Sequence, residues 1–456
     1  MQMAKAWIER LPRPVQQKLA AHPSLRKILV NISWLLIDNI LNITMSIVIG
    51  AWVARYLGPD QWGMLSYAIS FVGLFVIFAN LGLDYIVVRA IVRKDAPPEQ
   101  ILGTAFLLSF VAALTTYGVA AAIIWQINSD PLIRVLVLIA AGNLILQPFN
   151  TIDLWFQSQV ESKYTVWVKN LALLLNSGFK IVLILGQMPV IAFAWAAILQ
   201  QIMVVVGWLW VFSRRGPRMI TWQPKWHVAK GLLHEAWPMI ISGIATSVYM
   251  KIDQVILGSI LDTRAVGIYG AAVRLSELWY FVPMALAASL FPTIIRSRHL
   301  DETTYQRRIQ AFYDLMAGLG FLVAIFNTLF ALPLIYALFG PAYSASTPIL
   351  QVHTWATVFI CLGLARTRWL LAEDFAIFLT IAPTLGAISN VLLNLWLIPT
   401  YGGLGAAWAT VISYATSAYL SCLITPRLWP VFRQLTLSLL LPFRIASIRR
   451  SIQELI

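Results

Sequence analysis

About twelve apolar segments, each long enough to cross a lipid bilayer, dominate this chain. A soluble globule with 59% hydrophobic and 11% charged residues would lack a solvated surface. The sequence therefore predicts an all-α integral membrane protein. A window of about 20 residues, which spans roughly 30 Å of hydrocarbon, places the transmembrane helices at residues 28–54, 62–88, 101–125, 133–157, 165–186, 189–212, 232–257, 266–293, 314–338, 347–370, 376–398 and 403–425.

Basic residues alternate between the gaps that separate these segments. Of the 33 Lys and Arg residues, Arg55, Arg134 and Arg264 lie in or beside gaps on one side, three lie well inside segments, and the others lie in or beside the intervening gaps or near the chain ends. Because positive residues accumulate on the cytoplasmic side, both termini are predicted to be cytoplasmic. The net charge of +14 is spread over short loops instead of forming one patch, which argues against a nucleic-acid partner and for anionic lipid.

A weak internal repeat predicts two pseudo-symmetric lobes of six helices each. LGPDQWGMLSYA, from Leu57, aligns with LDTRAVGIYGAA, from Leu261, and matches Gly63 to Gly267. Chance similarity between apolar helices is the alternative interpretation. Parallel two-lobe membrane proteins are mostly transporters that alternate access by rocking the lobes. The predicted order is a basic cytoplasmic arm (1–27), an N-lobe (28–212), a basic cytoplasmic linker (213–231), a C-lobe (232–425) and a cytoplasmic tail with an interfacial helix (426–456).

Three cations lie inside predicted spans, where an unpaired charge is costly. Counting from the helix ends places Lys180 about 22 Å, Lys251 about 28 Å and Arg274 about 18 Å from the cytoplasmic edge of the membrane. A cavity that carries these cations would attract the diphosphate and polar sugar of a lipid-linked substrate. The alternative is a structural brace, in which Arg274 pairs with Glu277, and Lys251 or Arg274 pairs with Asp253.

Acids near the middle of the bilayer are candidates for carrying a coupling proton or sodium ion. Asp38, about 15 Å deep, and Glu277, about 14 Å deep, are closest to the middle, and Asp253 is the third candidate. Asp38 is followed by asparagines, so a hydrogen bond across a helix interface is its alternative role. Arg55 closes the first span at the outer surface, either as a gate residue that belongs to the cationic cavity or as an interfacial cation.

The order of short motifs along the chain resembles one family. The motifs are ARYLGPDQWG (54–63), LGLDYIVVR (81–89), DLWFQSQ (153–159), KIDQVILG (251–258), VGIYGAAVRLSE (266–277), FGPAY (339–343) and IPTYGGLGAAWAT (398–410). Over about residues 28–425 the chain is similar to the bacterial O-antigen and polysaccharide flippases of the multidrug/oligosaccharidyl-lipid/polysaccharide exporter superfamily. The resemblance implies that a polyprenyl-diphosphate-linked oligosaccharide is moved across the bacterial inner membrane to the periplasmic leaflet. It also implies a polysaccharide polymerase and a chain-length regulator as partners.

Sequence motifs for enzymatic chemistry do not occur. We find no Gly-x-x-x-x-Gly-Lys phosphate loop, Gly-x-Ser-x-Gly or His-Glu-x-x-His motif, and no metal-ligand or cofactor spacing. A multipass polysaccharide polymerase would need a large catalytic loop, whereas the gaps reach about 20 residues. A cation-coupled multidrug exporter of the same superfamily is the main alternative, although acids and aromatics would suit its cationic drugs better than a group of cations. We therefore expect a transporter whose only cofactor is a coupling ion.

Overall fold

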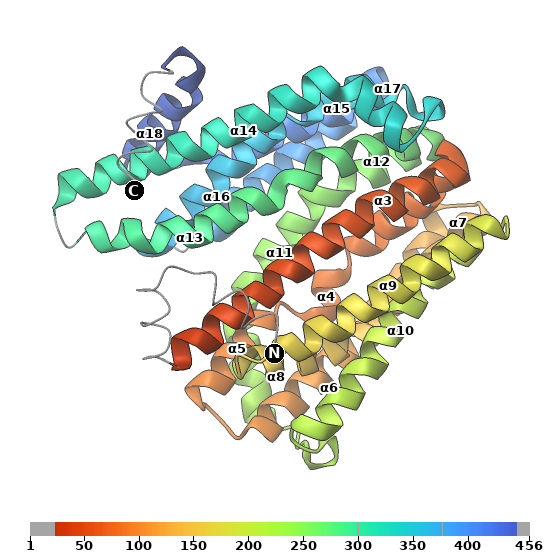
Figure 1. Cartoon of the computed structure of the whole chain (residues 1–456), viewed down its shortest axis with the longest axis vertical. Coiled ribbons are helices and arrows are strands. Elements are labelled where there is room, and N and C mark those ends of the chain that lie inside the picture. Colours follow the sequence, from red (N-terminus) through yellow and green to blue (C-terminus); the bar gives the residue numbers. More distant parts are fainter. Residues whose placement is uncertain (1–22, 299–300, 376, 445–456) are drawn as a thin grey trace. The chain divides into compact units, whose positions relative to one another are not determined.

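The computed structural model describes residues 23–298, 301–375 and 377–444, in which all regular elements are helices (Figure 1). Most of the predicted arm (1–27), the last twelve residues of the predicted tail and the side chain of the predicted ion site Asp38 lie outside the described residues. The α-helices are α3 (Pro23–Gly73), α4 (Val76–Asn80), α5 (Asp84–Arg93), α6 (Pro98–Ile127), α7 (Pro131–Leu146), α8 (Asn150–Ser158), α9 (Lys163–Leu185), α10 (Val190–Arg215), α11 (Trp226–Ile260), α12 (Thr263–Glu277), α13 (Phe281–Ser297), α14 (Glu302–Leu338), α15 (Ser346–His353), α16 (Ala356–Ala372), α17 (Phe378–Ala418) and α18 (Trp429–Leu439).

Nine stretches of the described chain are long and apolar enough to cross a membrane, so the predicted count of about twelve is not confirmed. Two of the longest helices account for part of the difference, because glycines interrupt them. Gly58 (φ 71°, ψ 170°) lies within the 51 residues of α3, and Gly402 (φ 55°, ψ −134°) lies within the 41 residues of α17. Both helices exceed the roughly 20 residues that one crossing needs. Each glycine falls in a gap predicted between two spans, and each adopts a backbone conformation that favours glycine.

The chain divides into two compact units. Unit 1 consists of Met1–Ile49, Phe78–Ala120 and Ile139–Trp237, and unit 2 consists of Gly50–Ile77, Ala121–Leu138 and Pro238–Ile456. The boundaries run through α3, α4, α6, α7 and α11 instead of following the predicted linker 213–231. The two six-helix lobes therefore stay a prediction.

Aspartates start two of the helices in unit 2. The side chain of Asp262 accepts a hydrogen bond from the Ala265 amide at 2.7 Å, and that of Asp301 accepts one from the Thr304 amide, also at 2.7 Å. These bonds satisfy backbone donors that would otherwise lack partners in the first turns of α12 and α14. Hydrogen bonds from Thr303 and Thr304 lower the pKa of the Asp301 carboxyl to about 2.

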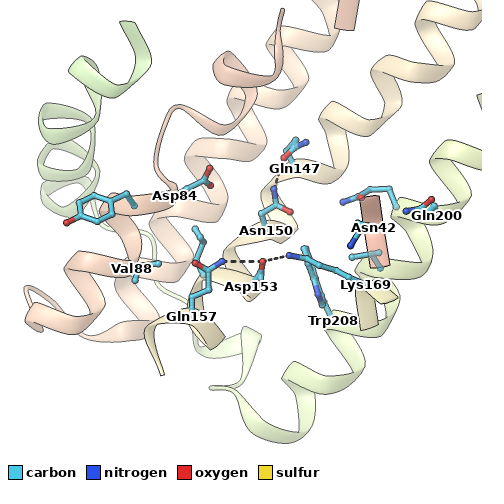
Figure 2. A pocket seen from close by; sticks show the side chains of 14 residues that line it. Asn42, Asp84, Val88, Gln147, Asn150, Asp153, Gln157, Lys169, Gln200 and Trp208 are labelled. Atoms are coloured by element: carbon cyan, nitrogen blue, oxygen red, sulfur yellow. Dashed lines mark hydrogen bonds and ion pairs between the residues drawn. The ribbon is translucent and has the colours of Figure 1, made fainter. Parts of the chain in front are cut away.

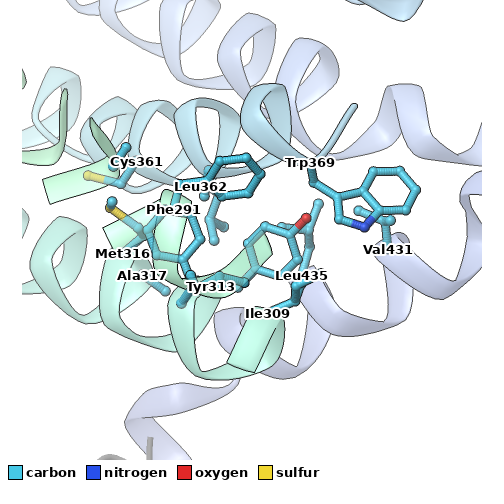
Figure 3. Close-up of a cluster of buried hydrophobic side chains, with 14 of the residues drawn as sticks. Phe291, Ile309, Tyr313, Met316, Ala317, Cys361, Leu362, Trp369, Val431 and Leu435 are labelled. Atoms are coloured by element: carbon cyan, nitrogen blue, oxygen red, sulfur yellow. The ribbon is translucent and has the colours of Figure 1, made fainter. Parts of the chain in front are cut away.

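A buried apolar core lies in unit 2, where α13, α14, α16 and α18 pack together (Figure 3). Tyr313 and Met316 of α14 face Leu362 of α16, and Val431 and Leu435 attach α18 to the same cluster. The Ser438 hydroxyl of α18 also donates to Asp314 of α14 at 2.6 Å. The helix within the predicted tail thus packs on the protein through its buried face.

The contact between α14 and α16 depends on a glycine. A Cβ atom at Gly320 would lie 2.7 Å from the Cα of Val358, which is backbone and cannot rotate away. We expect Gly320→Ala to destabilise the protein by about 1–3 kcal/mol through overpacking. Gly318→Ala is the matched control, because its Cβ would meet only the flexible end of Leu441, at 3.3 Å. Thermal unfolding of the purified protein should separate the two variants, and equal midpoints would contradict the tight crossing.

Candidate functional site

A polar cavity of about 780 Å³ lies within unit 1 (Figure 2). Its walls come from α3, α5, α8, α9, α10 and the 3-10 helix η1 (Gln147–Phe149). Two aromatic side chains, Tyr85 and Trp208, also line it. Amides can donate and accept hydrogen bonds at once, so this lining matches hydroxyl-rich ligands. The six lining amide side chains are Asn42, Gln147, Asn150, Gln157, Gln200 and Gln201.

Helical spacing puts these polar groups on common faces. Asn150, Asp153 and Gln157 of α8 are three and four residues apart, so they project from one side of the helix. On α10, Gln201 and Trp208 are seven residues apart and share a second face. The opposite face of α10 is apolar and forms a separate surface pocket with residues such as Trp195 and Ile202. The sequence of α10 thus separates a polar face from an apolar one.

An ion pair fixes one wall of the cavity. Asp153, 8% exposed, accepts a hydrogen bond from the Lys169 ammonium at 2.7 Å and one from the Gln157 amide at 3.3 Å (Figure 2). The Lys169 ammonium also lies 5.3 Å from the centre of the Trp208 ring, within cation–π range. Each charge of the pair therefore has a fixed partner.

The predicted substrate contact Lys180 lies on α9, in the same unit. The amide of Asn176 is 3.3 Å from the Lys180 ammonium and 2.7 Å from the Gln200 amide. Lys169, Asn176 and Lys180 are seven and four residues apart, so they follow one face of α9 over about 16 Å. Asn176 thereby links Lys180 to the cavity wall.

The other two predicted interior cations lie in unit 2. The Arg274 guanidinium is 5.3 Å from the centre of the Trp62 ring, and it also packs against Gly50, where a Cβ would be 2.6 Å from Nη2. Lys251 and Arg274 are both close enough to Glu277 to interact with it electrostatically. The structure thus brings together the groups of the predicted brace. A substrate contact for either cation stays a prediction.

The predicted ion site Asp253 is buried among hydroxyl groups of unit 2. It is 3% exposed, and it accepts hydrogen bonds from the Tyr269 hydroxyl and from the backbone N–H of Gln254, the latter at 2.8 Å. The Thr410 hydroxyl lies 3.5 Å from the same carboxylate and 3.2 Å from Tyr269. His353 stacks edge-on against the Tyr269 ring. This cluster from α11, α12, α15 and α17 offers several oxygen atoms within one buried site.

The two aligned repeat segments contact each other in unit 2. A Cβ at Gly63 would lie 1.7 Å from the Thr263 carbonyl oxygen, and a Cβ at Gly267 would lie 2.0 Å from the Pro59 carbonyl oxygen. Pro59 aligns with Thr263, just as Gly63 aligns with Gly267. The two contacts are therefore reciprocal, as expected around a local two-fold axis.

An ion pair crosses the same contact. Asp60 and Arg264, which are again aligned positions, lie 3.1 Å apart. Nearby, the exposed Arg55 contacts Gly340, and a Cβ atom at Gly340 would lie 3.2 Å from Nε of Arg55. The Tyr343 hydroxyl donates a hydrogen bond to the Ala54 carbonyl at 2.7 Å. We call residues 59–63 and 263–267 the symmetric crossing. Sequence comparison detected the alignment but gave no sign that the aligned residues touch.

A family model described as a polysaccharide biosynthesis protein matches residues 52–348. The chain belongs to this family. Two curated relatives of this polysaccharide biosynthesis protein are described as flippases of Haloferax volcanii. The probable flippase AglR is 30% identical over 182 residues, which is 39% of this chain and 38% of that protein. The probable low-salt glycan biosynthesis flippase Agl15 is 23% identical over 199 residues, which is 43% of this chain and 42% of that protein. Both matches cover less than half of the relatives' lengths.

Solved structures of low sequence identity share the fold of this polysaccharide biosynthesis protein. An inward-facing multidrug resistance MATE family transporter of the MOP superfamily matches with a TM-score of 0.68 at 16% identity, covering 87% of this chain and 95% of that one. The lipid II flippase MurJ matches with a TM-score of 0.65 at 13% identity, covering 93% and 96%. The resemblance to polysaccharide flippases is confirmed, and the chain is a multi-pass membrane protein.

Proposed function

We propose that this chain is a flippase that moves a polyprenyl-diphosphate-linked oligosaccharide from the cytoplasmic to the outer leaflet of the plasma membrane by alternating access. The polar cavity of unit 1 is the observation that carries the proposal. Its volume of about 780 Å³ lies within the usual range of small-molecule sites, roughly 300–1,000 Å³. Six amides and two aromatic side chains suit a sugar, while the polyprenyl tail stays in lipid.

The cations inside the predicted spans are proposed to act on the diphosphate. Lys180 is the first candidate, because it continues the polar face of α9 beyond the cavity. Lys251 and Arg274 are proposed to contact the same group at another stage of the cycle. Arg55 is proposed to act at the outer gate, next to the symmetric crossing.

The energy for transport is proposed to come from a proton or sodium ion that binds at Asp253. Hard cations such as sodium prefer oxygen ligands, and the carboxylate of Asp253 has the hydroxyls of Tyr269 and Thr410 beside it. A buried acid of this kind in a transporter is a functional candidate by default. Glu277 and Asp38 are the remaining candidates for ion coupling. A polysaccharide polymerase and a chain-length regulator would then act on the exported glycan.

The alternative is a cation-coupled multidrug exporter, because the fold is shared with such a transporter. The lining of the unit 1 cavity favours the glycan instead. Amides outnumber the two acids, Asp84 and Asp153, and Asp153 is already paired with Lys169. A cationic drug would therefore meet few free negative charges.

Reconstitution tests the proposal. We expect proteoliposomes that contain the full chain to move a fluorescent polyprenyl-diphosphate oligosaccharide between leaflets, and protein-free liposomes not to do so. Gln201→Trp should slow this movement at least tenfold, because an indole would fill part of the cavity. Ile202→Trp is the matched control, since the neighbouring residue lies on the apolar face of α10. No movement by the wild-type protein, or equal rates for both variants, would reject the proposed route.

A further inference from the structure

The charged groups that line the unit 1 cavity carry a net negative charge. They are Asp84, Asp153 and Lys169. Lys169 is held by Asp153 at 2.7 Å, so this pair contributes no net charge. The carboxylate of Asp84 is the remaining charge of the lining.

Asp84 lies at the start of a helix and lines the cavity. It is the first residue of α5, where the partial positive charge of the helix N-terminus stabilises a carboxylate. One of its oxygens accepts a hydrogen bond from the Asn80 amide at 3.3 Å. In the part of the chain that the structure describes, the other oxygen has no protein partner, and the side chain is exposed to the cavity.

Asp153 already balances the charge of Lys169. An acidic sugar that drew the Lys169 ammonium away would leave Asp153 without its cation. Asp153 is only 8% exposed, so water would not replace that cation well. Removing one partner of a partly buried ion pair leaves the other charge uncompensated, which is unfavourable. An acidic sugar would also face the like charge of Asp84 at close range.

The same cavity offers polar groups to a neutral sugar. Each of the six lining amide side chains can donate and accept hydrogen bonds, and one oxygen of Asp84 can accept one. The hydroxyls of a neutral sugar can pair with both kinds of group.

We infer that the unit 1 cavity selects a glycan whose cavity-bound sugar is uncharged and rejects sugars that carry a carboxylate. This inference rests on the proposed function, because it names the substrate class of the proposed flippase. The diphosphate of the same substrate stays outside the cavity. Lys180, about 16 Å from Lys169 along α9, lies where that group would be bound.

Two probes that differ only at carbon 6 test the inference. They are a short-chain polyprenyl diphosphate that carries glucose and the same lipid carrying glucuronic acid, each titrated into the purified full chain by calorimetry. We expect the glucose probe to bind at least tenfold more tightly. Asp84→Asn should reduce the difference to less than threefold, because it removes the like charge and keeps the shape. Asp95→Asn removes an exposed acid of the same unit that does not line the cavity, and it should leave the difference unchanged.

The outcomes separate this inference from the proposed function. Equal affinities, tighter binding of the glucuronic acid probe, or no binding of either probe would overturn the inference. Leaflet exchange of both probes in proteoliposomes is then measured separately. Exchange of both probes at equal rates would support the proposed flippase and contradict the selectivity. Selective binding without any exchange would support the selectivity and reject the flippase.

Discussion

Cross-linking the symmetric crossing is expected to stop glycan translocation. In a protein with Asp60→Cys and Arg264→Cys, a short bifunctional thiol reagent should join the two segments, because the native side chains meet at 3.1 Å. Alternating access requires the outer gate to open, and Arg55 and Arg264 both fall in gaps that the charge pattern assigns to the outer side. The leaflet exchange rate should fall at least tenfold after cross-linking and recover when a reductant cleaves the linker.

The controls for this experiment are built into the chain. Both native cysteines, Cys361 and Cys422, are buried, so the reagent should not reach them in the folded protein. Each single cysteine variant should keep its activity after the same treatment. Full activity in the cross-linked double variant would show that the symmetric crossing does not separate during transport.

Replacing Asp253 is expected to uncouple transport from its driving ion. Asp253→Asn keeps the size of the side chain but removes the charge that a proton or sodium ion would neutralise. In proteoliposomes with an imposed sodium or proton gradient, the stimulated exchange rate should fall at least tenfold. Binding of the glycan lipid should change by less than threefold, because the unit 1 cavity is untouched.

Asp314→Asn is the matched control for this change. Asp314 is also a buried acid of unit 2, 3% exposed, but it accepts hydrogen bonds from Ser438 and Gln310 in the packed core between α14 and α18. Its replacement should lower the unfolding temperature without altering the response to the gradient. If Asp253→Asn responds to the gradient as the wild type does, the coupling ion binds elsewhere.

Much of the helix pattern follows from the sequence, since apolar length and charge placement are local properties of the chain. The gap predicted between 398 and 403 contains Gly402, which interrupts α17. The number of spans does not follow as directly. α12 and α13 are short helices separated by the 3-10 turn η3 (Leu278–Tyr280), where hydropathy alone predicted one long span. Kinks and short breaks depend on tertiary packing, which a hydropathy window does not contain.

The candidate site was predicted only in part. Asp253 stood out because an acid inside an apolar segment is visible in the sequence. The unit 1 cavity could not be recognised in the sequence, because amides are common in membrane helices. Its lining is also assembled from distant segments, from Asn42 on α3 to Trp208 on α10. The only local signal is the spacing of Asn150, Asp153 and Gln157 on α8, and it does not reveal Lys169 as the partner of Asp153. Folding brings these groups together.

Photo-cross-linking tests most directly whether the glycan enters the unit 1 cavity. Benzoyl-phenylalanine would replace Gln201, which lines the cavity, or Ile202, which lies on the apolar face of α10. Each protein would be irradiated with a polyprenyl-diphosphate glycan radiolabelled in the sugar, and the mass of the labelled fragment determined after the lipid diphosphate is removed by mild acid. We predict sugar label retained at position 201 and absent at position 202. Sugar label at position 202 alone, or at neither position while leaflet exchange continues, would contradict the account.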